Sequence, residues 1–157
     1  MSEIAMGPDK ALYFTNYSNF IGRMTTGGTI SIFSDQNPSS SLILNVALGP
    51  DKRLWFADYY GHVGTMTPAG GYTMYSTSAS ASTGTHAQWI TAGPDGAMWF
   101  LSLQGSSSVI YRITTSGHVT NSYAIPTANA QPDQMAAGPD GSLWFTENGA
   151  NKIGRLQ

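Results

Sequence analysis

Few side chains in this 157-residue sequence could do chemistry. There is no cysteine, so disulfides and thiolate zinc sites are excluded. No serine lies in a GxSxG motif, and no glycine cluster has the strand-to-helix context of a nucleotide fingerprint. Scattered carboxylates remain, with His86 in the segment GTHAQW and with Tyr59 and Tyr60 directly after Asp58. The tyrosine pair could stack on a sugar or peptide ring, or it could pack against a neighbouring part of the fold.

The charge and hydropathy of the chain exclude two classes of partner. Only 10% of the residues are charged and the net charge is −2, whereas a nucleic-acid binder needs a basic stripe against the phosphates. No apolar run reaches 18 residues, so we expect no membrane span. The first ten residues, MSEIAMGPDK, lack the basic-then-apolar order of a secretory signal, which favours a cytoplasmic location.

The elements that must position these side chains are short strands. Gly, Ser, Thr and aromatic residues are frequent, and no helical apolar period extends beyond about one turn. A phrase that begins with GPD occurs four times, and its first residues are Gly7, Gly49, Gly93 and Gly138. A period of about 40–45 residues with paired aromatics is typical of β-propeller blades of four strands. The sequence therefore predicts an all-β propeller with four repeats of about 42–45 residues.

Each repeat has the same order of strands and turns. We predict first strands at 4–6, 46–48, 89–92 and 135–137, each followed by the GPD turn. The second strands carry the aromatic pairs 13–14, 55–56, 99–100 and 144–145. Third strands are expected at 21–24, 63–66, 110–113 and 153–156, and fourth strands at 29–33, 72–75 and 119–123. Lys10 and Lys52 stand where the later turns have Gly96 and Gly141, so those two turns are expected to be more strained or of another type.

The last repeat stops after its third strand. We place the four blades at about 2–43, 44–86, 87–131 and 132–157, of which the last lacks its outer strand. A partial ring has open edges that invite pairing with another chain. We expect two chains to join head to tail into one ring, as a homodimer. Closure of one chain as a four-bladed ring and a piece of a longer or designed protein are the alternatives.

The last repeat carries a family resemblance. Its residues AGPDGSLWFTENGANKIGR resemble the repeat of the virginiamycin B lyase family, the streptogramin-lyase-like propellers, and the resemblance covers almost the whole chain. It implies a propeller fold. It also implies an activity in which Mg²⁺ assists the opening of a cyclic depsipeptide by elimination at its ester.

The resemblance also implies a set of functional positions, of which this chain keeps one. The glutamate that ends WFTE is Glu147. The family's histidine position holds Asp133, the glutamate position two residues earlier holds Gln131, and the histidine position one blade earlier holds Gln88. An aspartate can bind Mg²⁺ or act as a weak base. If the chain is an enzyme, Glu147 and Asp133 are therefore the expected catalytic and metal-binding residues.

The same family frame predicts a polar ring at one mouth of the propeller channel. One set of ring residues comes from the start of the innermost strands: Ser2, Leu44, Gln88 and Asp133. The other set, the loop set, comes from the loop after the second strands: Asn16, Asp58, Ser102 and Glu147. They either form a ligand site or cap turns. We add Tyr59, His86 and Gln131 as candidate ligand-binding residues, and we expect His62 and His118 to lie on the surface.

Two functions follow from these residues. The first is a binding module that takes a small-molecule or peptide ligand at the channel mouth. The second is an Mg²⁺-dependent lyase that opens a cyclic depsipeptide or lactone and so inactivates an antibiotic. The replacement of both family histidines favours the first.

Overall fold

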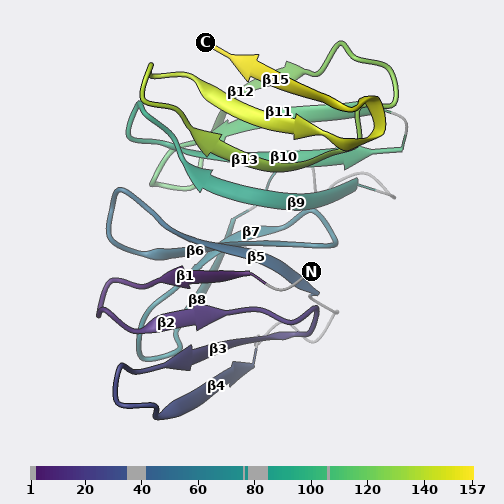
Figure 1. Cartoon of the computed structure of the whole chain (residues 1–157). Helices are drawn as coiled ribbons and strands as arrows, with labels where there is room; N and C mark the ends of the chain where they lie inside the picture. Colours follow the sequence, from purple (N-terminus) through teal and green to yellow (C-terminus); the bar gives the residue numbers. More distant parts are fainter. Residues whose placement is uncertain (1–2, 35–41, 76, 78–84, 106) are drawn as a thin grey trace.

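The structure is a computed structural model that describes residues 3–34, 42–75, 77, 85–105 and 107–157. It consists of four antiparallel sheets, which follow one another along the chain from the purple to the yellow end in Figure 1. We call these sheets the first to fourth blades. Their strands are, in the first blade, β1 (Ile4–Met6), β2 (Leu12–Phe14), β3 (Phe20–Met24) and β4 (Ile30–Ser34). In the second blade they are β5 (Ile43–Leu48), β6 (Leu54–Asp58), β7 (Val63–Met66) and β8 (Tyr72–Tyr75).

The third and fourth blades repeat this order. The third contains β9 (Thr85–Ala92), β10 (Met98–Gln104), β11 (Ser107–Ile113) and β12 (Val119–Ala124). The fourth contains β13 (Pro132–Ala137), β14 (Leu143–Glu147), the short 3₁₀ helix η2 (Asn148–Ala150) and β15 (Lys152–Leu156). In every sheet the strands pair in sequence order, and the first strands β1, β5, β9 and β13 lie next to one another on the inside. The predicted all-β, partial propeller with blades of four, four, four and three strands is confirmed. The described part of the chain holds no helix with the length and hydropathy of a membrane span.

The inner strands begin earlier than their apolar residues suggest. β5, β9 and β13 start at Ile43, Thr85 and Pro132, three or four residues before the predicted starts. The first residues of these strands still pair with the second strands, as Thr85 does with Gln104 and Pro132 with Glu147. The mouth residues Leu44, Gln88 and Asp133 lie within these strands, each at a bulge where the register shifts.

The four GPD turns have one common geometry. Lys10 and Lys52 adopt positive φ values of 64° and 60°, close to the 77° and 76° of Gly96 and Gly141. The lysines therefore do not change the turn type. They occupy a left-handed conformation that disfavours any residue with a Cβ, so the expectation of greater strain is the one that fits.

The aspartate of each GPD turn binds an aromatic residue and an arginine. In the fourth blade, Asp140 accepts hydrogen bonds from Trp144 Nε1 at 3.2 Å and from Arg155 Nε at 3.0 Å. Asp95 makes the same contacts with Trp99 and Arg112, and Asp9 contacts Tyr13 and Arg23. In these three blades the arginine is the cross-strand neighbour of the aromatic residue. The turn is thus tied to the second and third strands of its own blade.

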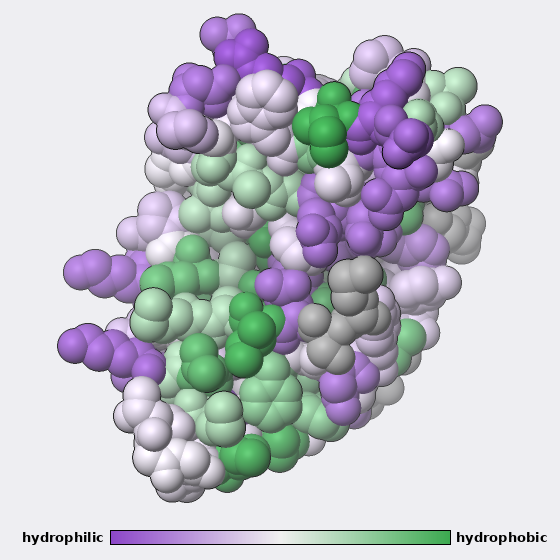
Figure 2. Space-filling view, viewed as in Figure 1, coloured by the Kyte–Doolittle hydropathy of each residue, from purple (hydrophilic) through white to green (hydrophobic). Residues whose placement is uncertain are grey.

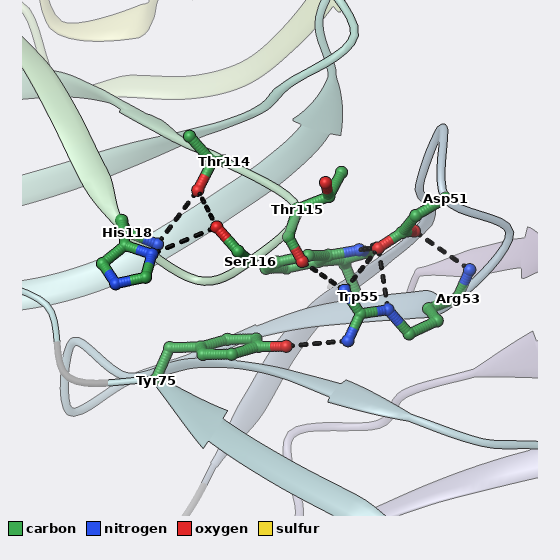
Figure 3. Close-up of polar contacts among 8 residues, drawn as sticks. All are labelled: Asp51, Arg53, Trp55, Tyr75, Thr114, Thr115, Ser116 and His118. Atoms are coloured by element: carbon green, nitrogen blue, oxygen red, sulfur yellow. Dashed lines mark hydrogen bonds and ion pairs between the residues drawn. The ribbon is translucent and has the colours of Figure 1, made fainter.

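The second blade modifies this pattern and uses its arginine to reach the next blade. Arg53 comes from the turn itself and donates to Asp51 Oδ2 from Nε at 2.8 Å. Its other nitrogens donate to the Tyr75 hydroxyl and to the backbone carbonyl of Thr115 in the third blade, as Figure 3 shows. Arg53 therefore joins two blades near their outer strands.

Three apolar clusters hold neighbouring blades together. One joins the first and second blades, one the second and third, and one the third and fourth. Each cluster takes the first aromatic of the preceding blade and the second aromatic of the following one, such as Trp55 and Phe100. Because adjacent strand residues point to opposite faces, the paired aromatics bind each blade to both of its neighbours.

Candidate functional site

A pocket of about 200 Å³ lies where the beginnings of the inner strands meet. All four blades contribute to it. Its lining residues are Glu3, Tyr17, Leu44, Tyr59, His86, Gln88, Trp89, Leu103 and Asp133. Four of these, Tyr59, His86, Gln88 and Asp133, are candidates from the sequence, and Leu44 belongs to the predicted ring. We call this cavity the mouth pocket.

A side-chain bridge between the third and fourth blades forms one wall of the mouth pocket. Gln88 Nε2 donates a hydrogen bond to Asp133 Oδ1 at 2.9 Å. The other carboxylate oxygen of Asp133 accepts from Asn148 Nδ2 at 3.4 Å. The two residues that stand at the family's histidine positions are therefore bonded to each other.

Aromatic rings form a second wall. The His86 ring lies on the Tyr59 ring with a centroid separation of 3.8 Å, and His86 Nδ1 contacts the Tyr59 backbone oxygen at 2.5 Å. Trp89 donates from Nε1 to the Met135 backbone oxygen at 2.8 Å, which fixes its indole. Tyr17 is half exposed and has a left-handed φ of 57°. The pocket thus offers flat, partly fixed rings on which an apolar ligand could stack.

The charges around the mouth pocket are negative. Glu3 and Asp133 line it, whereas none of its described lining residues is lysine or arginine. Burial raises the pKa of the Glu3 carboxyl, and a hydrogen bond from the Ile4 backbone opposes that shift. Carboxylates beside aromatic faces favour a ligand with an apolar body and a cationic or hydrogen-bond-donating group.

Gln131 lies in a second, more polar pocket next to the first. This cavity of about 450 Å³ shares Gln88, Leu103 and Asp133 with the mouth pocket and adds Gln131 and Asn148. Gln131 has a left-handed φ of 43° directly before β13. Gln88 and Asp133 therefore border both cavities.

The predicted loop set does not line the mouth pocket. Asp58 is fully buried, and its carboxylate accepts hydrogen bonds from the backbone of Tyr60 and His62 and contacts His62 Nδ1 at 2.8 Å. Burial raises the pKa of the Asp58 carboxyl, and the contacts with His62 and Tyr60 oppose the shift. Asp58 thus closes its own turn, which is the turn-capping alternative for this residue.

The other members of the loop set are placed differently from Asp58. Asn16 accepts from the Ser18 hydroxyl at 2.5 Å on the surface. The side chains of Ser102 and Glu147 are buried, and Ser102 Oγ and Glu147 Oε2 have no hydrogen-bond partner among the residues that the structure describes. Ser2 lies outside the described residues. Of the two remaining histidines, the His62 side chain is one-third exposed and His118 is bonded to Ser116 near the outer strands.

Asp133 and Glu147 do not meet in one cavity. Asp133 lines the mouth pocket, whereas Glu147 lines a surface pocket beside η2 and β15. Among the residues that the structure describes, no three Asp, Glu or His side chains gather in a way that could hold a metal ion. Both Asp133 oxygens already accept amide hydrogen bonds. This donor set does not fit a Mg²⁺ ion held by the two carboxylates, and we derive no step through one.

Four residues of the mouth pocket were not predicted from the sequence: Glu3, Tyr17, Trp89 and Leu103. One signal for Tyr17 was available. It follows Asn16 as Tyr59 follows Asp58, so the two tyrosines occupy the same position of the repeat. Glu3 and Trp89 likewise share one repeat position, next to the predicted ring residues.

Comparison with known proteins agrees with this architecture. The model of the virginiamycin B lyase family matches residues 1–157. The solved virginiamycin B lyase from Staphylococcus aureus is 39% identical, with a TM-score of 0.85 over 99% of this chain and 51% of the lyase. A catalytically inactive variant of that lyase, solved with quinupristin, matches equally well. A streptogramin B lyase structure is 32% identical with a TM-score of 0.80, over 99% of this chain and 53% of that one.

This chain spans about half the length of the solved lyases that it matches. A gluconolactonase from Xanthomonas campestris, at 15% identity and a TM-score of 0.74, shares the fold alone. None of the curated proteins matches the sequence.

Proposed function

Because the chain belongs to the virginiamycin B lyase family, we propose that it is a propeller module that binds a small organic molecule or peptide in the mouth pocket. The observation that carries this proposal is the composition of the pocket. Its lining combines the rings of Tyr59, His86 and Trp89 with the carboxylate of Asp133, and it draws on all four blades. Convergent polar groups in a largely apolar cavity are the usual features of a small-molecule site.

The chemistry of the pocket favours one class of ligand. An apolar or aromatic body would stack on Tyr59 and Trp89, and an ammonium or amide N–H would approach Asp133 and Glu3. Quinupristin is the natural first probe, since an inactive variant of the Staphylococcus aureus lyase was solved with it.

Binding can be tested by isothermal titration of the 157-residue chain with quinupristin. Tyr59→Ala removes a ring of the pocket and is expected to weaken binding about tenfold or more. Tyr60→Ala is the matched control, because Tyr60 is equally exposed but does not line the pocket. Equal affinities of the two variants, or no heat of binding in the wild type, would contradict the proposal.

We also propose that the ring is completed by a second copy of the chain, so that a homodimer presents one shared mouth. The start of each inner strand contributes to the mouth pocket. A second copy would add an equivalent set of residues on the opposite side of the channel.

The alternative function is a lyase of the kind that the family resemblance implies. One observation supports it, namely that the carboxylate of Asp133, which could act as a weak base, lines the pocket. Chromatography of quinupristin after incubation, with Mg²⁺ or with a chelator, separates the two functions. Elimination yields an isomer of unchanged mass with a new retention time, whereas the binding module returns the compound intact.

A further inference from the structure

One face of the first blade and one face of the fourth blade are exposed. The contacts between successive blades show which kind of face each of them would pack against. In the three clusters between blades, every preceding blade contributes the same two positions. These are the first aromatic, at Tyr13, Trp55 and Trp99, and a third-strand aliphatic residue, at Ile21, Val63 and Ile110. All six side chains are at most 8% exposed.

The fourth blade carries the same two positions on its open face. They are Trp144, which is 41% exposed, and Ile153, which is 64% exposed. A groove of about 240 Å³ lies between them and their neighbours, among them Met135, Phe145 and Thr146. The fourth blade therefore presents the face that every earlier blade buries against its successor. We call it the leading face.

The first blade presents the opposite kind of face. Following blades contribute Val46 and Leu54, or their equivalents in the third and fourth blades, to the clusters. The corresponding residues of the first blade are Ile4 and Leu12, which are 55% and 38% exposed instead of 2% and 0%. Cross-strand register places Met6 and Ile32 on this same side, and both are exposed. We call this side the trailing face; Figure 2 shows hydrophobic side chains gathered where the first blade lies.

We propose that the leading face of one copy packs against the trailing face of a second copy, and the reverse, in a head-to-tail pair. Each of the three junctions within the chain joins these two kinds of face, so a fourth junction of the same kind needs no new surface complementarity. Exposed apolar side chains that gather on one face are typical of protein contacts. The inference deepens the proposed ring completion and rests on it.

The pairing is tested by the mass in solution, measured by light scattering on a sizing column. We expect the chain of 16.7 kDa to run at twice that mass. Ile153→Lys on the leading face and Ile4→Asp on the trailing face each place an unpaired charge in both junctions, so each is expected to raise the dimer dissociation constant by about tenfold or more. Tyr60→Lys changes an exposed residue of the second blade that belongs to neither face, and it should leave the dimer intact.

A mixture of the two face variants gives the sharper result. In a head-to-tail pair of one Ile153→Lys copy with one Ile4→Asp copy, the lysine meets the aspartate at one junction and the other junction is wild type. Equal amounts of the two variants should therefore restore the dimer, while each alone stays monomeric. A monomeric wild type, variants that remain dimeric, or a mixture that stays monomeric would overturn the proposal. Because the measurement involves no ligand, a failed quinupristin titration would not affect it.

Discussion

Gln88 of the third blade donates a hydrogen bond to Asp133 of the fourth blade, with 2.9 Å between Nε2 and Oδ1. The two residues occupy equivalent positions of the repeat, in the first halves of β9 and β13. Their bond ties two blades together, and both residues line the mouth pocket.

Replacing Gln88 by Glu should make the pair sensitive to pH. Two carboxylates within hydrogen-bond distance cannot both ionise easily, so the pKa of one of them should rise. A rise of about one pKa unit corresponds to about 1.4 kcal/mol of lost stability near pH 7, which should be regained as the pH falls and one group is protonated. Urea unfolding of Gln88→Glu at pH 7 and pH 4.5 measures this. A variant as stable as the wild type at both values would show that the bond is absent in solution.

The left-handed lysines predict a stabilising substitution. Lys52→Gly relieves a conformation that costs an ordinary residue roughly 1–2 kcal/mol, but it also frees the unfolded chain by roughly 0.4–1 kcal/mol. We expect a net gain of up to about 1 kcal/mol in the free energy of unfolding. The reciprocal variant Gly96→Lys should lose about as much. A shift of the denaturant midpoint at an unchanged slope measures each change in the free energy of unfolding.

Arg53 should contribute more to stability than the arginines that bind the other turn aspartates, because it joins two blades. Arg53→Ala removes hydrogen bonds to Asp51, Tyr75 and the Thr115 carbonyl, and since the side chain is partly exposed we expect a loss of about 1–2 kcal/mol. Arg53→Lys should not recover this lost stability, because an ammonium group cannot make the planar set of contacts that a guanidinium makes. The control is Arg112→Ala, which breaks contacts within one blade only. Equal losses in both alanine variants would contradict a role in joining the blades.

Asp140 should contribute to the loss of stability in acid. The hydrogen bond from Trp144 is the main reason that the pKa of this carboxyl falls from 3.8 to about 2, with slight burial opposing and Ser142 and Arg155 assisting. Because the folded pKa lies below the unfolded one, the contribution is present above about pH 4 and is lost as the pH falls towards 2. Between pH 2 and pH 5 the melting temperature of Asp140→Asn should therefore depend less steeply on pH than that of the wild type. A parallel pair of curves would exclude this contribution.

The fold was predictable because the same pattern occurs in all four repeats. The glycine spacing, the GPD turns and the aromatic pairs each indicate a blade, and four copies average out local ambiguity. The starts of β9 and β13 were not predictable in the same way. Thr85 and Pro132 belong to those strands through pairing with Gln104 of β10 and Glu147 of β14, and no apolar alternation marks these strand starts.

The candidate site was predicted in part. The family frame identified Gln88 and Asp133, which line the mouth pocket, but it assigned Asp58 and Glu147 to the same mouth. Both side chains are buried, and Asp58 is held by hydrogen bonds from the backbone of Tyr60 and His62 in its own turn. Such placement depends on local backbone geometry and on packing between blades, which residue types alone do not specify.

The four tryptophans allow one spectrum to test the central claim. Trp89 lines the mouth pocket and also borders the leading-face groove, so the Gln88 side-chain amide separates the two sites. Trp55 and Trp99 are buried between blades, and Trp144 lies on the leading face. A ¹⁵N–¹H spectrum of the chain, followed while quinupristin is added, reports each indole N–H and the Gln88 side-chain amide separately. We expect the Trp89 indole and the Gln88 amide to shift in proportion to the bound fraction, with the other three indoles unchanged. Shifts confined to Trp144, or no shift at saturating ligand, would contradict a ligand site at the mouth of the propeller.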